Sequence, residues 1–328
     1  MDGVITSEQN YWDIASLTVY ELLNSDKFYG SKNFSSNDLL SRVKEIRSEV
    51  FEDDKLITLL KERGVNSNWD LAFVVFSYML SGKFSSYSDV LKYLEAHALP
   101  TFEMYDECAR LISERLHLPV EKCVRNEEIW LICRDVFQEW YLGSDGFFRL
   151  YGKKPNCSDK DSMERREVPV IDKDDIVMVL SALHNSGKKL LVATGRSDSE
   201  LLLPFELWDI GKYFEPDSLA TYTCIYNAEQ RLLKEGRHMQ LAKPHPYIFL
   251  KALFPYLSDS EILEGRYDKS VLKRALVVGD AGSDILAAKK MGADFLAVLT
   301  GVSGKKAEKY FKEQNAEYIC PSITGMIE

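Results

Sequence analysis

The sequence predicts an α/β protein in which a doubly wound parallel-sheet core is interrupted by an inserted all-helical domain. Apolar residues follow a helical spacing through the first half of the chain, and apolar strands alternate with helices in the second half. Polar residues follow several of those strands. We expect residues 1–8 and 170–328 to form the core, residues 9–152 the helical domain, and residues 153–169 a hinge.

Composition is typical of a globular protein and narrows the range of partners. The 328 residues suffice for roughly two domains, and 45% of them are apolar. The net charge of −10 argues against nucleic-acid binding, because phosphate contacts need clustered Lys and Arg. The six cysteines lack metal-like spacing and are expected to be reduced thiols. With no signal-peptide pattern and no apolar run long enough for a bilayer, we expect a cytoplasmic protein with no membrane partner.

The helical domain is predicted from its apolar stripes and from the turns that separate them. Tyr11, Ala15, Val19 and Leu22 mark one stripe, and similar runs recur as far as about residue 142. Six or seven helices are expected. The many aromatic residues could line a substrate pocket, but they are more often a domain's own core, and this is the reading we favour here.

The second half of the chain reads as strands and helices in alternation. Apolar strands flanked by helices indicate a parallel sheet covered on both faces, and ligands bind such sheets at the carboxyl ends of the strands. The expected strands are 189–194, 220–226, 275–278, 294–299 and 318–320, and the expected helices are 175–186, 197–207, 246–254 and 283–291.

Two carboxylates in one short segment suggest a metal site. Asp280 follows an apolar strand, and Asp284 lies four residues later on the first turn of a helix. This spacing allows both to face one point, and carboxylate oxygens suit Mg²⁺. Alternatively, Asp284 is only an acid favoured at the start of a helix. The strand immediately before Asp280 favours the metal site.

Three further polar residues are candidates for binding an anion. Thr194 and Gly195 end an apolar strand, where a hydroxyl and an open backbone N–H can hold a phosphate oxygen. Thr194 could instead be only a helix N-cap. Arg196 could contact the substrate anion or lie on the surface, and the sequence does not decide between the two. Lys243, which precedes Pro244, could neutralise a phosphoryl group.

These motifs together resemble the haloacid dehalogenase-like (HAD) phosphohydrolase superfamily. The resemblance rests on the opening Met1-Asp2-Gly3-Val4-Ile5-Thr6, on Thr194-Gly195-Arg196, on Lys243-Pro244, and on the segment Gly279-Asp280-Ala281-Gly282-Ser283-Asp284. It covers about residues 1–8 and 170–328. The helical domain then corresponds to a cap, which at roughly 150 residues is longer than the usual helical cap of this superfamily.

The resemblance implies a catalytic site and a reaction. Asp2, Thr194 and Lys243 would be catalytic, with Asp2 as general acid/base. Gly3, Gly195 and Arg196 would bind substrate, and Mg²⁺ would be held by Asp280, Asp284 and the main-chain carbonyl of Asp2. The expected reaction is hydrolysis of a small phosphorylated metabolite, broadly as in phosphoglycolate phosphatase, through an aspartyl-phosphate.

The nucleophile that the resemblance implies would precede Met1. We therefore expect the chain as printed to be inactive or weak, and the natural start to lie upstream, after an apolar strand. That strand would lie between the strands ending in Thr194 and Asp280, so two facing edges are expected without it. Two alternatives remain: a phosphosugar mutase of the same superfamily, or a non-catalytic binding or regulatory protein. The sequence does not indicate an oligomeric state.

Overall fold

The computed structural model describes residues 1–65 and 67–327, which divide into two compact units. The core unit consists of Met1–Glu8 and the chain from Glu167 onward, and the helical unit is Gln9–Arg166. The α/β class with an inserted helical region is confirmed.

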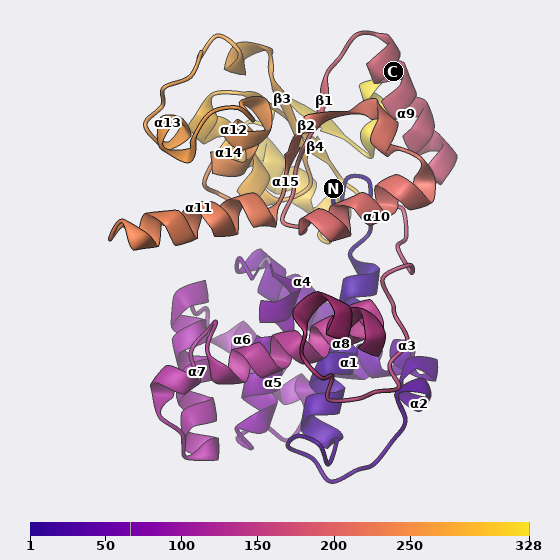
Figure 1. The fold of residues 1–328 in the computed structure, drawn as a ribbon, viewed down its shortest axis with the longest axis vertical. Coiled ribbons are helices and arrows are strands. Elements are labelled where there is room, and N and C mark those ends of the chain that lie inside the picture. The colour runs from indigo at the N-terminus through magenta and orange to yellow at the C-terminus, as the bar shows by residue number, and fades with distance from the viewer. Residues whose placement is uncertain (66, 328) are drawn as a thin grey trace. The chain divides into compact units, whose positions relative to one another are not determined.

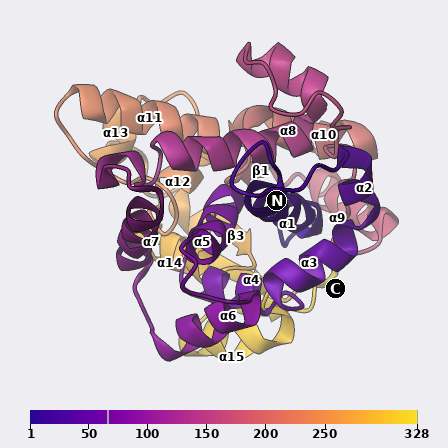
Figure 2. The same cartoon turned by 90° about the horizontal axis from the view of Figure 1, so that it is seen from below.

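The helical unit is built around its first helix. Helix α1 (Gln9–Asn24) packs against α3 (Val43–Phe51), α5 (Asn68–Leu80) and α8 (Glu128–Tyr151), as Figure 2 shows. The other helices are α2 (Ser36–Ser41), α4 (Lys55–Glu62), α6 (Tyr87–Ala96), α7 (Thr101–Leu116) and the 3₁₀ turn η1 (Val120–Lys122). Among the described residues, no helix is both long and apolar enough to cross a membrane.

Short polar signals start several of these helices. Ser35, Ser67 and Ser86 each accept a hydrogen bond from the backbone N–H of the aspartate three residues later. This satisfies one of the amides that a helix leaves unpaired at its N-terminus, and the aspartate favours the positive end of the helix dipole. Local sequence therefore explains where α2, α5 and α6 begin.

The large aromatic side chains fill the interior of the helical unit, as expected. The rings of Phe73, Tyr78 and Trp140 are fully buried, and Tyr11 stacks on Tyr141 with ring centroids 5.6 Å apart. All six cysteines are free thiols, as expected.

Most of the segment that was expected to be a hinge belongs to the helical unit. Residues 153–166 belong to the helical unit, and only the chain from Glu167 belongs to the core. Its charged residues suggested a solvated linker, but Lys160 is buried because its ammonium group pairs with Glu21 (2.8 Å) and Glu139 (2.9 Å). Met163 is also buried.

The core unit alternates helices and strands close to the predicted positions. Its strands are β1 (Leu190–Ala193), β2 (Phe214–Ala220), β3 (Leu276–Gly279), β4 (Asp294–Val298) and β5 (Tyr318–Cys320). Its helices are α9 (Lys173–Asn185), α10 (Asp198–Trp208), α11 (Tyr222–Lys234), α12 (Tyr247–Leu253), α13 (Asp259–Leu263), α14 (Gly282–Met291) and α15 (Ala307–Glu313).

One strand was predicted at the wrong place. The range 220–226 was expected to be extended, but β2 ends at Ala220 and α11 follows. The buried residues Ile225, Ala228 and Leu232 of α11 are spaced three and four apart, which is the period of a helix and not of a strand. Tertiary packing of this apolar stripe explains the difference.

The strands of the core form two parallel sheets within the part of the chain that is described. β1 pairs with β2, and β3, β4 and β5 pair in that order. Among the described strands, β1 pairs only with β2 and β3 only with β4, so each keeps one edge without a neighbouring strand. β1 and β3 are the two strands for which the sequence predicted an unpaired edge.

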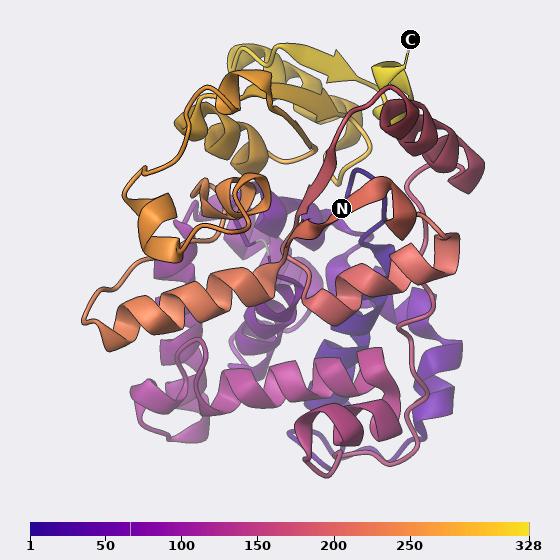
Figure 3. The ribbon, with the colours of Figure 1, turned by 45° about the horizontal axis from the view of Figure 1, so that its top comes forward.

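Both pieces of the sheet contribute to the same two apolar cores. On one face, Ile5, Val192 and Leu296 pack with residues of α9 and α10. On the other, Ala220 and Phe295 pack with residues of α11, α12 and α14. Figures 1 and 3 show α9 and α10 on one side of the strands and α11 to α14 on the other. The core is therefore one layered unit with a divided sheet.

Candidate functional site

The carboxyl ends of three strands bring the predicted residues Thr194 and Asp280, together with Thr300, to one edge of the core unit. Thr194 follows β1, Asp280 follows β3, and Thr300 lies two residues beyond β4. Because parallel strands end at a common edge, residues distant in sequence become neighbours there. The N-terminal turn joins this edge, since the Thr300 hydroxyl donates a hydrogen bond to the Gly3 carbonyl oxygen at 2.5 Å.

The N-terminal turn is closed by its own backbone. The Met1 carbonyl oxygen accepts hydrogen bonds from the N–H groups of Val4, Ile5 and Thr6, and the Gly3 N–H donates to the Thr6 carbonyl. Gly3 has φ +70°, a conformation that favours glycine. The Thr6 hydroxyl donates to Asp2 Oδ1 at 3.0 Å, which adds a side-chain contact that closes the turn.

Lys243 and Asp284 form an ion pair at this edge. Lys243 Nζ lies 2.7 Å from Asp284 Oδ1. Burial works against the charged form of Lys243, but Asp284, Asp280 and Asp2 outweigh it and raise the pKa of Lys243. Asp284 Oδ2 also accepts the Ala281 N–H at 3.3 Å. Asp284 therefore acts as a helix-start acid and still reaches the lysine.

Asp280 is the least compensated acid at this edge. Burial, followed by the charges of Asp284 and Glu8, raises its pKa to about 7. Lys243 works in the opposite direction without cancelling that rise. A cation close to Asp280 would relieve this electrostatic cost.

Asp2 is held by a buried arginine. Arg196 donates to Asp2 Oδ1 from Nη2 at 2.6 Å and from Nε at 2.9 Å. The same guanidinium donates to both carboxylate oxygens of Glu167, at 3.1 and 3.0 Å. Burial raises the pKa of Asp2, but the charge and hydrogen bonds of Arg196 outweigh it and hold that pKa at about 2.

Arg196 is not the surface cation that the sequence allowed, and its binding of a substrate anion stays a prediction. The side chain is 3% exposed, so it is not a surface cation. Its guanidinium binds Asp2, Glu167, the Thr6 hydroxyl and the Glu200 carbonyl, so its donors serve the protein itself. Arg196 instead connects the N-terminal turn to Glu167, where the chain returns from the helical unit.

Thr194 and Gly195 lie beside this arginine with different exposures. The Thr194 side chain is buried, and its hydroxyl accepts the Arg196 N–H at 3.2 Å. Gly195 is exposed, and an added Cβ there would meet nothing within 4 Å. The backbone after β1 is therefore open at Gly195, as an oxyanion site requires.

Comparison with known proteins gives a family match and several structural likenesses, of which two are described here. A family model described as HAD-hydrolase-like matches residues 240–326. The X-ray structure of a Northeast Structural Genomics Consortium target is similar over 99% of this chain and 95% of its own, with a TM-score of 0.74 and 26% identity. No curated protein matches the sequence significantly. The resemblance to HAD-like hydrolases is confirmed.

A second structural likeness is weaker. The crystal structure of a protein from Clostridium difficile, provisionally described as a phosphatase, covers 97% of this chain and 90% of its own. Its TM-score of 0.44 and identity of 14% are too low to support an inference about this HAD-like chain.

Three residues near this edge of the core unit were not identified from the sequence. Thr300 and Gly301 follow β4 with the same strand-Thr-Gly pattern as Thr194 and Gly195, so that pattern could have identified them. Glu167 had no such signal, because it lies in a charged stretch that reads as solvated. Its contact with Arg196 spans 29 positions in the sequence.

The described residues hold no preassembled metal cluster. Among residues 1–65 and 67–327, no three His, Cys, Asp or Glu side chains are grouped to hold a metal ion. Asp280 and Asp284 nevertheless offer the hard oxygen donors that Mg²⁺ prefers. Burial is the main cause of the raised pKa of Asp280, and a bound cation would favour its charged form. The chemistry of these two side chains therefore suits Mg²⁺.

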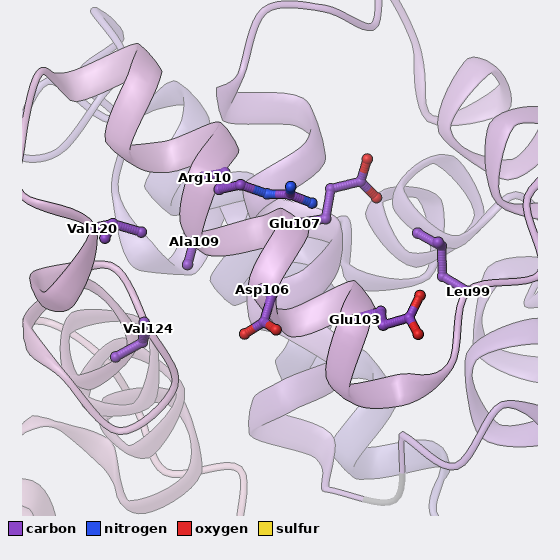
Figure 4. A pocket seen from close by; sticks show the side chains of 8 residues that line it. All are labelled: Leu99, Glu103, Asp106, Glu107, Ala109, Arg110, Val120 and Val124. Carbon is purple, nitrogen blue, oxygen red and sulfur yellow. The ribbon is translucent and has the colours of Figure 1, made fainter.

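A separate cavity lies within the helical unit. Its volume is about 640 Å³, and it lies along α7, with Glu107 beside Arg110 and with Asp106 and Glu103 further along the same helix (Figure 4). The remaining lining residues are Leu99, Ala109, Val120 and Val124. None of the predicted catalytic or metal-binding residues lines this cavity.

Proposed function

We propose that the core unit hydrolyses a small phosphate monoester with the help of Mg²⁺. The observation that carries this proposal is the ion pair between Lys243 Nζ and Asp284 Oδ1, 2.7 Å apart, at the strand end where Asp280 lies against Gly3 of the N-terminal turn. Three acids and one lysine at the carboxyl edge of a parallel sheet, beside an open Thr-Gly turn, suit phosphoryl transfer better than acyl or hydride transfer.

Lys243 and the turn at Thr194 would hold the phosphoryl group. Lys243 remains cationic because its neighbours raise its pKa, so it can neutralise charge on the transferring group. The exposed backbone at Gly195 can donate to a phosphate oxygen. Thr194 supports this turn through its contact with the Arg196 N–H.

Asp2 would accept the proton of the attacking water. With its pKa held at about 2 by Arg196, it is a carboxylate at neutral pH and can accept a proton from the attacking water. Its contacts with Thr6 and Arg196 fix the position of Oδ1. As a carboxylate it is better suited to the water step than to the first protonation of a leaving group.

Mg²⁺ would be held by Asp280, Asp284 and the main-chain carbonyl of Asp2. When bound, it would neutralise charge on the phosphoryl oxygens and orient the ester. Binding it would require Asp284 to share its carboxylate between the ion and Lys243. In the family that the chain resembles, the attacking carboxylate would stand immediately before the position of Met1, two residues ahead of Asp2.

Inorganic phosphate release from a panel of small phosphate monoesters tests this proposal. We expect release that depends on Mg²⁺, stops with a chelator, and falls at least tenfold in Lys243→Gln. Lys289→Gln, which changes an exposed lysine on α14, is the matched control and should match the parent chain. Isomerised sugar phosphate without free phosphate would instead indicate a mutase. Binding without turnover would indicate a regulatory protein.

A further inference from the structure

The carboxylate of Asp280 lies in a narrow slot between two glycines from other loops. A Cβ built on Gly3 would lie 2.1 Å from Asp280 Oδ2, and one built on Gly301 would lie 2.0 Å from the same atom. Protein Cβ atoms essentially never make contacts this short. A side chain at either position would therefore displace the carboxylate.

The two walls of this slot are fixed to the sheet. The Thr300 hydroxyl donates to the Gly3 carbonyl oxygen, which joins the two glycine loops directly. Leu299, just before that loop, donates its N–H to the Cys320 carbonyl at 3.0 Å and so extends the β4–β5 ladder. Gly279, the last residue of β3, pairs with Ala297 of β4 and places Asp280 beside the same loop.

Hydrogen bonds do not account for the placement of Asp280. No described residue donates a hydrogen bond to its carboxylate, whereas Asp2 and Asp284 both accept such bonds. Steric confinement fixes the carboxylate and leaves its oxygen lone pairs available. An acid held in this way is preorganised for a cation, which needs those lone pairs.

We propose that Gly301 is a positioning residue that confines the Asp280 carboxylate for a divalent cation. The proposal rests on the proposed function, because the cation belongs to that site. Gly301 is more informative than Gly3, because Gly3 also needs glycine for its φ of +70°, while Gly301 has no positive φ. Replacing Gly301 by Ala therefore tests the space beside Asp280 and not the backbone conformation.

Mn²⁺ binding to the full chain, measured by water-proton relaxation, tests the positioning role. We expect Gly301→Ala to weaken Mn²⁺ binding by about 10- to 100-fold, as changes around metal ligands commonly do. Gly146→Ala is the control, because its added Cβ lies within α8 and meets only side-chain atoms of Leu142 and Arg149. Mn²⁺ affinity in Gly301→Ala equal to that of the parent chain would overturn the proposal.

A double-mutant cycle tests the slot without relying on a metal. If the clash is with Asp280, Gly301→Ala should lower the unfolding midpoint in the parent chain and have little effect in an Asp280→Gly background. A Gly301→Ala chain that fails to fold, together with a double variant that folds, supports the slot equally. If Gly301→Ala lowers the unfolding midpoint by as much in the Asp280→Gly background as in the parent chain, the slot is overturned. A parent chain that binds no Mn²⁺ would overturn the metal role, while a positive cycle would still establish the confinement.

Discussion

Arg196 joins two carboxylates that lie far apart in the sequence, and this contact organises the residues around it. Asp2 belongs to the N-terminal turn and Glu167 to the point where the chain returns to the core unit, and both bind the same guanidinium. The Ser7 N–H also donates to the Val168 carbonyl, so the outgoing and returning chains lie side by side. The position of Asp2 therefore depends on Glu167, which precedes α9, the first helix of the core unit after the helical insertion.

Arg196→Gln is expected to destabilise the protein by roughly 3–5 kcal/mol, because it leaves the Glu167 carboxylate buried without its partner. Urea denaturation measures this change. The double variant with Glu167→Gln should recover much of the loss, because it removes the uncompensated charge. Arg42→Gln, which breaks an exposed pair with Glu45, should leave the midpoint unchanged. Equal effects at Arg42 and Arg196 would contradict this account.

Asp280 should make stability depend on pH. Its pKa rises from 3.8 to about 7 in the folded state, so the stability associated with its protonated form is lost as pH rises towards 7. Asp284 and Glu8 face it as like charges, with Lys243 opposing them. Without divalent cations, the stability of the parent chain relative to Asp280→Asn should fall by roughly 3 kcal/mol between pH 5 and pH 8. A difference independent of pH, measured by urea denaturation, would contradict this origin.

At the scale of elements, sequence patterns located most helices and strands because the patterns are local. β4 and α14 end close to their predicted positions, and Gly292 ends α14 with φ +79°. The end of β2 was misplaced although Ile225, Ala228 and Leu232 of α11 have the spacing of a helix. The burial of residues 153–166 was not predictable in this way, because it depends on contacts between distant residues, such as Lys160 with Glu21, which leave no periodic signal.

In the candidate site, too, residues with a local sequence signal could be predicted and contacts between distant residues could not. Asp280, Asp284, Thr194 and Lys243 could be proposed because each stands at the end of an apolar strand or in a recognisable motif. The role of Arg196 could not be predicted, because its partner Glu167 is identified only by the folded chain.

Helix α8 contains a residue with non-helical backbone angles, Gly143, with φ 72° and ψ 165°. An added Cβ there would lie 2.8 Å from the Ser162 backbone nitrogen. Gly143→Ala should therefore cost roughly 1–3 kcal/mol in thermal or urea unfolding. Gly146→Ala, three residues later in the same helix, should change stability by no more than about 1 kcal/mol. Similar effects of the two substitutions would show that the backbone at Gly143 is not constrained.

At the scale of the whole molecule, each unit has its own interior, and the two chain crossings between them are adjacent. Thr6 bridges Pro169, and the Val170 N–H donates to the Ile5 carbonyl, so the helical unit leaves and rejoins the core at one place. Adjacent termini are typical of an inserted domain that can fold alone.

The fragment Gln9–Arg166 should therefore unfold cooperatively by urea when monitored by circular dichroism. A fragment ending at Gly152 should not, because it lacks Lys160 and leaves Glu21 and Glu139 buried without their partner. Equal stability of the two fragments would place the boundary at residue 152, as the sequence suggested.

The most direct test of the proposed chemistry places an apolar strand ending in Asp immediately before Met1 and compares it with the same strand ending in Asn. Release of inorganic phosphate in the presence of Mg²⁺ is the measurement. We predict that the Asp form turns over at least a hundredfold faster than the Asn form, because only the former supplies an attacking carboxylate beside Lys243 and Asp280. Equal rates in the two forms, or no phosphate release from either, would contradict the assignment of this edge as a phosphatase site.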